Sequence, residues 1–314
     1  MRTPERTIRT PRIVLVAGMA CLLAACSESP TAPTGGLRPG SYSADRLEPT
    51  FSFDTVDVPG ALATSPGGIN AAGDISGTYV DATGHSHGFI HHNGNFTSIE
   101  FPGADNTSVN GIGPSGDVVG THWNDDEEVV AFHGYHRSAQ GEFEDVHFPG
   151  HLYEIPQRIL ADGRIFGCRH DHDLMGSMRG IMMSSSGASE TDMFASMNNG
   201  ATPDGHLVIG FYTDMMVMPS RTEAYVIENG AITPFIVPGS TLTNAWDINA
   251  RGDIVGVFRD GSGVHGYVRT DAGFTTINVP GAAATRAFGI DARGDIIGTF
   301  VGGGMTHGFL ARRA

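Results

Sequence analysis

Two stretches far apart in the chain are nearly the same: GINAAGDISGTYVDATGHSHGF at residues 68–89 and GIDARGDIIGTFVGGGMTHGF at residues 289–309. Their shared core, G-D-[IV]-x-G, recurs along the chain, and two weaker copies fill the middle. The copies begin 42 to 47 residues apart. They lie at residues 73–77, 116–120, 163–167, 205–210, 252–256 and 294–298. A near-constant period of this size indicates a repeat architecture rather than a single irregular core.

Each copy is predicted to form four short strands. In the first copy, a turn over residues 70–73 contains Asn and Gly, which both favour turn conformations. Asn93-Gly94 is a strong hairpin signal further along, and Pro102-Gly103 ends the fourth strand. Four antiparallel strands in each unit of ~40–50 residues are typical of a β-propeller blade. The sequence therefore predicts an all-β fold with six blades.

An open β-solenoid is the competing architecture, and the two ends of the repeat region favour the propeller. The sixth copy stops at residues 307–314, where its fourth strand should begin. Residues 51–58, FSFDTVDV, match FTTINV at residues 274–279, which is the fourth strand of the fifth copy. We therefore expect the N-terminal strand to complete the last blade and close the ring. A solenoid would need polar caps, and none is visible.

The Pro-Gly step, G-[IV]-[ND]-x-x-G-D-[IV]-x-G and H-G-[FY] together resemble the extracellular repeats of the HAF family. The resemblance covers residues 51–314 and is strongest in the first, fifth and sixth copies. It implies a secreted bacterial repeat protein with a propeller fold. The resemblance points to no catalytic residue and to no particular activity.

The first 25 residues have the pattern of a lipoprotein signal peptide. Four arginines precede an apolar run that is too short to span a bilayer as a mature helix, and Leu-Ala-Ala-Cys ends it at Cys26. This ending resembles a bacterial lipobox, in which Cys26 would be lipidated. An ordinary signal peptide with an incidental Cys26 is the alternative. Residues 26–50 are rich in Pro, Ser, Thr and Gly and are predicted to form a flexible tether to the propeller domain, residues 51–314.

These features predict a lipid anchor in the bacterial cell envelope, at the outer membrane or cell surface. The formal net charge of -15 repels phosphates, so nucleic acid is not expected as a partner. We expect a monomer whose ligand is a glycan or another protein. Cys168 has no predicted disulfide partner once the leader is removed and Cys26 is lipidated.

Acidic and amide side chains recur four residues after the repeat core, in the predicted loops between second and third strands. Variable loops on a rigid scaffold often carry function. These oxygens could form a broken ring that holds Ca²⁺ or a polyhydroxyl ligand. Alternatively, each one caps its own loop in an Asx-turn, which is the simpler interpretation for a residue in phase with the repeat. The candidates are Asp81, Asn124, Asp125, Asp171, Asp214 and Asp260.

The third copy departs from the pattern and suggests a second candidate site. Its loop holds His170, His172, Asp173 and Met175, and alternate histidines on an extended segment share a face. Imidazole and thioether ligands suit Cu, and imidazole also suits Zn. Drift in a degenerate blade, with Met as adaptable packing, is the alternative. Cys168 occupies a strand position in the same copy.

No motif for nucleophilic, phosphate or metalloprotease chemistry is present. The histidines of H-G-[FY], at His87, His265 and His307, are expected to be structural. We therefore expect a non-catalytic binding or scaffold module. The alternative is a glycan-active hydrolase or lyase that uses the central funnel of the propeller, since one fold hosts many functions.

Overall fold

The computed structural model describes residues 51–125, 131–171, 173–193 and 195–313. Almost every element in this part is a β-strand, and the only helix is the short α1 (Leu174–Ser177). Within the described ranges, no helix is both long and apolar enough to cross a membrane. The predicted leader and tether (residues 1–50), including Cys26, and His172 of the second candidate site lie outside the described residues.

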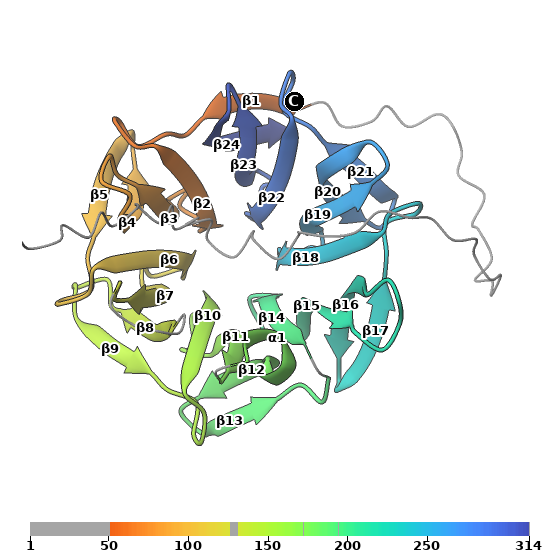
Figure 1. Ribbon diagram of the computed structural model, residues 1–314, viewed down its shortest axis with the longest axis horizontal. Coiled ribbons are helices and arrows are strands. Elements are labelled where there is room, and N and C mark those ends of the chain that lie inside the picture. Colours follow the sequence, from red (N-terminus) through yellow and green to blue (C-terminus); the bar gives the residue numbers. More distant parts are fainter. Residues whose placement is uncertain (1–50, 126–130, 172, 194, 314) are drawn as a thin grey trace, which may run out of the picture.

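The strands form four hydrogen-bonded sheets arranged in a ring (Figure 1). One four-stranded sheet contains β6 (Asn106–Ile112), β7 (Val118–Trp123), β8 (His133–Arg137) and β9 (Phe143–Val146). The other contains β10 (Tyr153–Ile159), β11 (Ile165–His170), β12 (Arg179–Ser184) and β13 (Gly187–Glu190). Within each, every strand is antiparallel to the next in sequence.

The other two sheets have eight strands each. The first comprises β2 (Ala63–Ile69), β3 (Ile75–Val80), β4 (Ser86–His92), β5 (Asn95–Ile99), β22 (Ala284–Ile290), β23 (Ile296–Gly302), β24 (Met305–Arg313) and β1 (Phe51–Thr55). The second comprises β14 (Ser196–Ala201), β15 (Leu207–Asp214), β16 (Arg221–Glu228), β17 (Ala231–Phe235), β18 (Leu242–Ile248), β19 (Ile254–Asp260), β20 (Gly263–Thr270) and β21 (Gly273–Ile277).

Each eight-stranded sheet consists of two four-stranded antiparallel units joined by a single parallel residue pair. These pairs are Ala63 with Thr306 and Thr222 with Leu242. The prediction of an all-β, propeller-like fold is therefore confirmed. The strands β2, β6, β10, β14, β18 and β22 lie nearest the centre of the ring (Figure 1).

The N-terminal strand closes the ring as the sequence predicts. β1 pairs antiparallel with β24, in a register that places Phe51 opposite Arg313 and Thr55 opposite Phe309. Phe53 packs edge-on against the ring of Phe309, with centroids 5.7 Å apart. Strands from the two ends of the described chain thus belong to one antiparallel unit.

The repeat core is explained by two different demands on its glycines. The first Gly of each copy sits in a tight turn at positive φ, as Gly116 does at 89°. The second Gly faces the backbone of the innermost strand, and a Cβ on Gly120 would clash with the carbonyl oxygen of Ser108. The motif therefore fixes both a turn and a close approach of two strands.

The aromatic residue of H-G-[FY] fills the core. Phe89, Tyr135, Tyr267 and Phe309 are all fully buried. The hydroxyl of Tyr135 donates a hydrogen bond to the carbonyl oxygen of Ser108 at 2.8 Å, so this side chain also connects the third strand of its unit to the first. Apolar side chains of neighbouring units pack together, which places the core between the units of the ring.

Every innermost strand has a β-bulge at the same point. The register shifts between Pro66 and Gly68, and at the matching place in the other five innermost strands. The residue left out of the ladder contacts the next innermost strand: Asn110 Nδ2 donates to the carbonyl oxygen of Pro156 at 2.8 Å, and Asn199 Nδ2 to that of Ala245 at 2.7 Å. The extra residues are Gly67, Asn110, Gln157, Asn199, Trp246 and Phe288.

Candidate functional site

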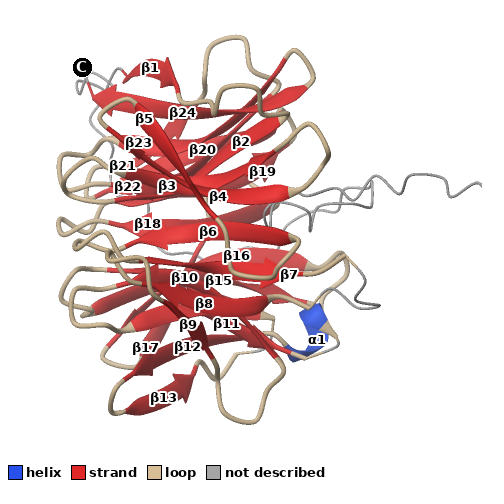
Figure 2. Ribbon diagram, turned by 90° about the vertical axis from the view of Figure 1, so that its left-hand side faces the viewer, coloured by secondary structure: helices blue, strands red, loops and turns tan. Residues whose placement is uncertain are grey.

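The loops between the second and third strands of the units share one face of the ring with the connections that lead into the next unit. Figure 2 shows α1, which lies in the loop between β11 and β12, at this face on the right-hand side. The six oxygen-bearing candidates all lie at or just after the end of a second strand. They are therefore on one face, as the sequence predicted.

Three of these carboxylates close their own loops. Oδ1 of Asp81 accepts hydrogen bonds from the backbone N of Thr83 at 2.8 Å and its hydroxyl at 2.7 Å. Asp260 accepts the same pair from Ser262, at 2.8 and 2.7 Å. Asp214 accepts from the backbone N of Met216 at 2.9 Å. The Thr83 hydroxyl is the main cause that lowers the pKa of Asp81 below its usual range. These contacts favour the Asx-turn interpretation.

The other three candidates hold neighbouring connections. Asn124 Oδ1 accepts from the backbone N of Asp105 at 3.1 Å, and Asp125 Oδ1 accepts from Asn106 Nδ2 at 2.8 Å. Asp171 lies 3.3 Å from His151 Nδ1. Among the residues that the structure describes, no three or more His, Cys, Asp or Glu side chains are grouped so as to hold a metal ion. The Ca²⁺ ring stays a prediction.

The second candidate site is only partly described. His170 is fully buried, and burial lowers the pKa of its imidazole. Asp173 caps α1, where its Oδ1 accepts from Gly176 N at 3.0 Å. Met175 belongs to α1, but its side chain, like His172, lies outside the described part. Cys168 is a buried strand residue, and burial raises the pKa of its thiol. The Cu or Zn site therefore stays a prediction.

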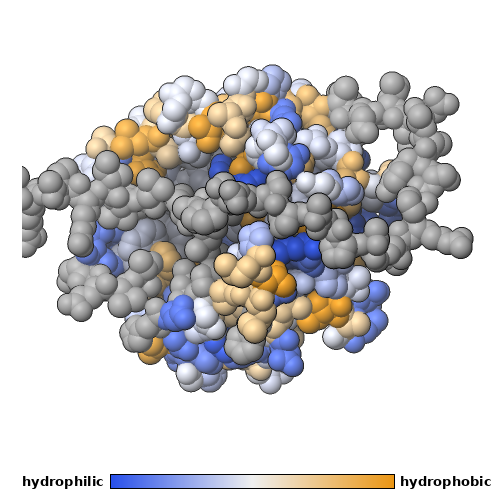
Figure 3. All heavy atoms as spheres, turned by 45° about the vertical axis from the view of Figure 1, so that its right-hand side comes forward, coloured by the Kyte–Doolittle hydropathy of each residue, from blue (hydrophilic) through white to orange (hydrophobic). Residues whose placement is uncertain are grey.

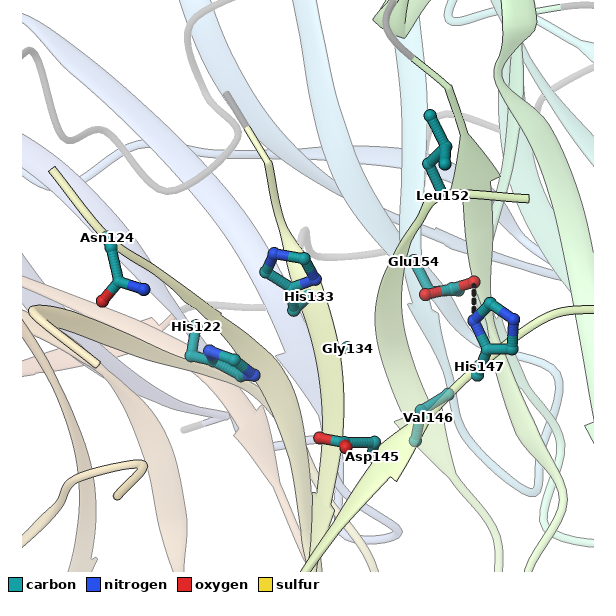
Figure 4. Close-up of a pocket in the computed structure, with 9 residues that line it drawn as sticks. All are labelled: His122, Asn124, His133, Gly134, Asp145, Val146, His147, Leu152 and Glu154. Carbon is teal, nitrogen blue, oxygen red and sulfur yellow. Dashed lines mark ion pairs between the residues drawn. The ribbon is translucent and has the colours of Figure 1, made fainter. Parts of the chain in front are cut away.

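A cleft of about 320 Å³ opens between the β6–β9 sheet and the β10–β13 sheet (Figure 4). Three histidines and two carboxylates dominate its polar lining. Figure 4 shows His122 and His133 on neighbouring strands, with the His147–Glu154 pair facing them across the opening. We call this the histidine cleft; its lining residues are His122, Asn124, His133, Gly134, Asp145, Val146, His147, Leu152 and Glu154.

His122 replaces an aromatic residue of the repeat. In the first, fifth and sixth copies Tyr79, Phe258 and Phe300 occupy its position, and each one packs against the histidine of H-G-[FY] with ring centroids 5.0 to 5.1 Å apart. The third copy has Arg169 at this position. The His122 ring keeps this geometry against His133, at 5.3 Å. On its other side it stacks on Phe101 at 3.6 Å. His122 thus adds two ring nitrogens where these three copies have a tyrosine or phenylalanine ring.

His147 replaces a hydrogen-bond acceptor of the repeat. In the first, fifth and sixth copies this position holds Glu100, Asn278 or Asp57, whose oxygens lie 2.7 to 2.9 Å from Nδ1 of the H-G-[FY] histidine in the same unit. His147 instead lies 3.3 Å from Glu154 Oε1, and its side chain is 64% exposed. The repeat's usual acceptor is therefore absent at this position.

Glu154 replaces a threonine of the repeat. The threonine hydroxyl accepts a hydrogen bond from the backbone N that precedes the Pro-Gly step, as Thr64 does from Val58 at 3.0 Å. Glu154 Oε1 performs this function for Phe148 at 2.8 Å, while the rest of its larger carboxylate borders the cleft. Three departures from the repeat, on β7, on β10 and just after β9, thus meet in one place.

The environment sets the charge of the cleft. Burial, and then the nearby His133, lower the pKa of His122 to about 4, so its imidazole is neutral at pH 7. Nδ1 of His122 is buried and has no hydrogen-bond partner among the described residues. Burial raises the pKa of Glu154, although its hydrogen bond from Phe148 acts in the opposite direction. The cleft therefore offers the neutral imidazole of His122 as a hydrogen-bonding group beside the carboxylates of Asp145 and Glu154.

The axis of the ring contains a different arrangement. Nη2 of Arg158 on β10 lies 3.0 Å from Oδ1 of Asp247 on β18, and both side chains are buried. Burial raises the pKa of Asp247. A glycosidase needs two carboxylates facing each other across the substrate, whereas the carboxylate here faces a guanidinium. Nothing in this pair favours the hydrolase or lyase alternative.

Sequence reasoning did not find the histidine cleft. It treated the H-G-[FY] histidines as structural and omitted His133, which belongs to the same motif. It found Asn124 by counting from the repeat core, but not the side chains opposite. Aligning the copies position by position would have marked His122, His147 and Glu154 as departures. Their meeting point depends on how adjacent units pack.

The comparisons with known proteins identify the fold alone. A scan against family models found no match, and a sequence search of curated proteins found none either. A TolB structure from Agrobacterium tumefaciens is similar over 74% of this chain and 88% of its own, with 12% identity and a TM-score of 0.51. An acylaminoacyl peptidase bound to a chloromethyl ketone has 11% identity over 79% of this chain and 44% of its own, with a TM-score of 0.50. An inactive virginiamycin B lyase from Staphylococcus aureus has 15% identity over 84% of this chain and 100% of its own, with a TM-score of 0.48.

Proposed function

We propose that this protein is a six-bladed propeller lipoprotein of the bacterial cell envelope that binds a ligand in the histidine cleft without transforming it. The blade count is supported by the repeat and by the single parallel pairs that join the units of the eight-stranded sheets. The resemblance to HAF repeats supports an extracellular position. In this proposal, lipid on Cys26 anchors the chain and residues 26–50 tether it.

One observation carries the assignment of the site: three positions that serve the repeat elsewhere are replaced in the histidine cleft, and the replacements face one another. Residues in phase with a repeat ordinarily serve its structure. The three positions are neighbours in other units as well, so what distinguishes this unit is that all three hold side chains of another type around an open cleft. A concave site with a few convergent polar groups is the usual form of a ligand pocket.

A repeat-restored variant tests the site directly. His122→Phe, His147→Asn and Glu154→Thr place in the cleft the residues that other units already carry, so the fold should tolerate them. The melting temperature of the full-length protein and of this variant is measured against sugars, amines, amino acids and divalent metals. We expect at least one compound to raise the melting temperature of the parent but not of the variant, because ligands that bind the native state stabilise it. Equal shifts in both would contradict the assignment.

The anchor is tested separately. We expect Cys26→Ala to move the protein from the membrane fraction to the soluble fraction, because lipid on that residue would hold it at the membrane. Cys168→Ala, at a buried strand position, is the matched control and should leave the distribution unchanged. Retention of the Cys26→Ala protein in the membrane fraction would rule out this anchor.

A further inference from the structure

We infer that the ligand of the histidine cleft is a neutral saccharide of one or two sugar rings. This inference rests on the proposed function and adds the chemical class of the ligand. Three properties of the lining support it: its charge, its hydrogen-bonding groups and the volume that it encloses.

The charge of the lining disfavours anions. Asp145 and Glu154 border the cleft, its lining contains no Arg or Lys, and the chain carries a formal net charge of -15. A cation would have to be held by Asp145, because Glu154 is already engaged by Phe148 N at 2.8 Å and by His147 at 3.3 Å. A ligand without net charge avoids repulsion by the two carboxylates and needs no second ion-pair partner in the lining.

The polar groups suit hydroxyls. A sugar hydroxyl both donates and accepts hydrogen bonds, and so does a neutral imidazole, which carries one N–H and one bare nitrogen. His122, which lines the cleft, carries one such imidazole. The Asn124 amide can also do both, and the carboxylate of Asp145 can accept from two hydroxyls at once. An apolar ligand would leave these groups without partners, which costs free energy.

The remaining lining suits the C–H faces of a sugar ring. Leu152 borders the cleft, and 47% of its surface is exposed. Ligand pockets typically range over ~300–1,000 Å³, and the volume of about 320 Å³ lies at the small end. One or two rings fit this size, and a long polymer would have to extend outside.

The test is saturation-transfer NMR on the full-length protein with maltose, cellobiose and N,N′-diacetylchitobiose, each alone, and with spermidine as a cationic comparator. We expect at least one disaccharide to bind, with Kd at least about tenfold weaker in the repeat-restored variant. His265→Phe, which changes the equivalent of His133 in another unit, is the matched control and should leave Kd unchanged. Leu152→Asp should also weaken binding.

Two results would overturn the inference. If no disaccharide binds, or if Kd is the same in the repeat-restored variant, the saccharide assignment is wrong. If spermidine alone binds and depends on the three substituted residues, the ligand class is wrong while the histidine cleft stands as a binding site. Failure of every compound in the wider melting-temperature screen would instead remove the proposed function itself.

Discussion

Arg158 and Asp247 form a buried ion pair between two different sheets. Nη2 of Arg158 lies 3.0 Å from Oδ1 of Asp247, and the side chains are only 8% and 6% exposed. Oδ2 of Asp247 also accepts a hydrogen bond from the backbone N of Ile290 at 3.0 Å. One carboxylate therefore connects β10, β18 and β22 near the centre of the ring.

Removing one partner of this pair should be costly. We expect Asp247→Asn to lower the free energy of unfolding by roughly 3 kcal/mol, because the guanidinium of Arg158 is left buried without a countercharge. Urea unfolding followed by fluorescence measures the change. The double variant Arg158→Met with Asp247→Leu should recover most of the loss. A single variant as stable as the parent would show that the pair is solvated.

Stability should depend on pH through His122. The folded state holds its pKa at about 4, against about 6.5 in an unfolded chain. Between these values the unfolded state binds more protons, so this contribution is present above pH 6.5 and is lost as the pH falls towards 4. We expect His122→Phe to reduce the loss of unfolding free energy between pH 7 and pH 4 by roughly 2 kcal/mol. An unchanged pH profile in the variant would contradict the burial of this imidazole.

The junction between the two ends of the described chain depends on Asp57. Its Oδ1 accepts from Gly308 N at 3.0 Å, and its Oδ2 lies 2.7 Å from His307 Nδ1. We expect Asp57→Ala to cost about 1 to 2 kcal/mol and to accelerate hydrogen exchange of the Gly308 amide. Asp54→Ala, which removes an exposed pair with Arg312, is the control and should change little. Equal effects of the two substitutions would argue against a specific junction.

The loop carboxylates provide a separate test of the predicted calcium ring. Because Asp81 already closes its own turn, Asp81→Ala should lower stability by about 1 kcal/mol whether Ca²⁺ or EDTA is present. Thermal melts in both conditions measure this. A melting temperature that rises with Ca²⁺ in the parent, and not in the variant with both Asp81→Ala and Asp260→Ala, would support the ring.

The backbone was largely predictable from the sequence because each copy of the repeat has the same conformational and packing requirements at equivalent positions. Gly116 needs positive φ, Gly120 needs room beside Ser108, and Tyr135 fills the core, and each demand appears in the motif itself. The pairing of β1 with β24 followed from matching residues 51–58 to a strand missing elsewhere. Because the copies can be compared with one another within a single sequence, the repeat and the strands it predicts can be detected without a structure.

The site was not predictable in the same way. His122, His147 and Glu154 are spread over two sheets, and only the packing of those sheets brings them to one opening. The sequence placed the loop carboxylates on one face of the ring. The orientation of the Asp81 oxygens, towards its own backbone or towards a ligand, could not be predicted from the sequence. Hydrogen-bond geometry decides that question in favour of the turn.

The bulge in each innermost strand also matters for how such a chain can change over generations. The extra residue stands outside the ladder of hydrogen bonds, so its identity is not dictated by strand pairing, and within this one chain it is Gly67, Asn110, Gln157, Asn199, Trp246 or Phe288. Contacts with the next innermost strand limit some of these residues, as at Gly67, where a Cβ would lie 2.8 Å from the carbonyl oxygen of Asn110. Even so, side chains at the centre of the ring differ from one unit to the next, from polar to aromatic, while the strand pairing stays the same.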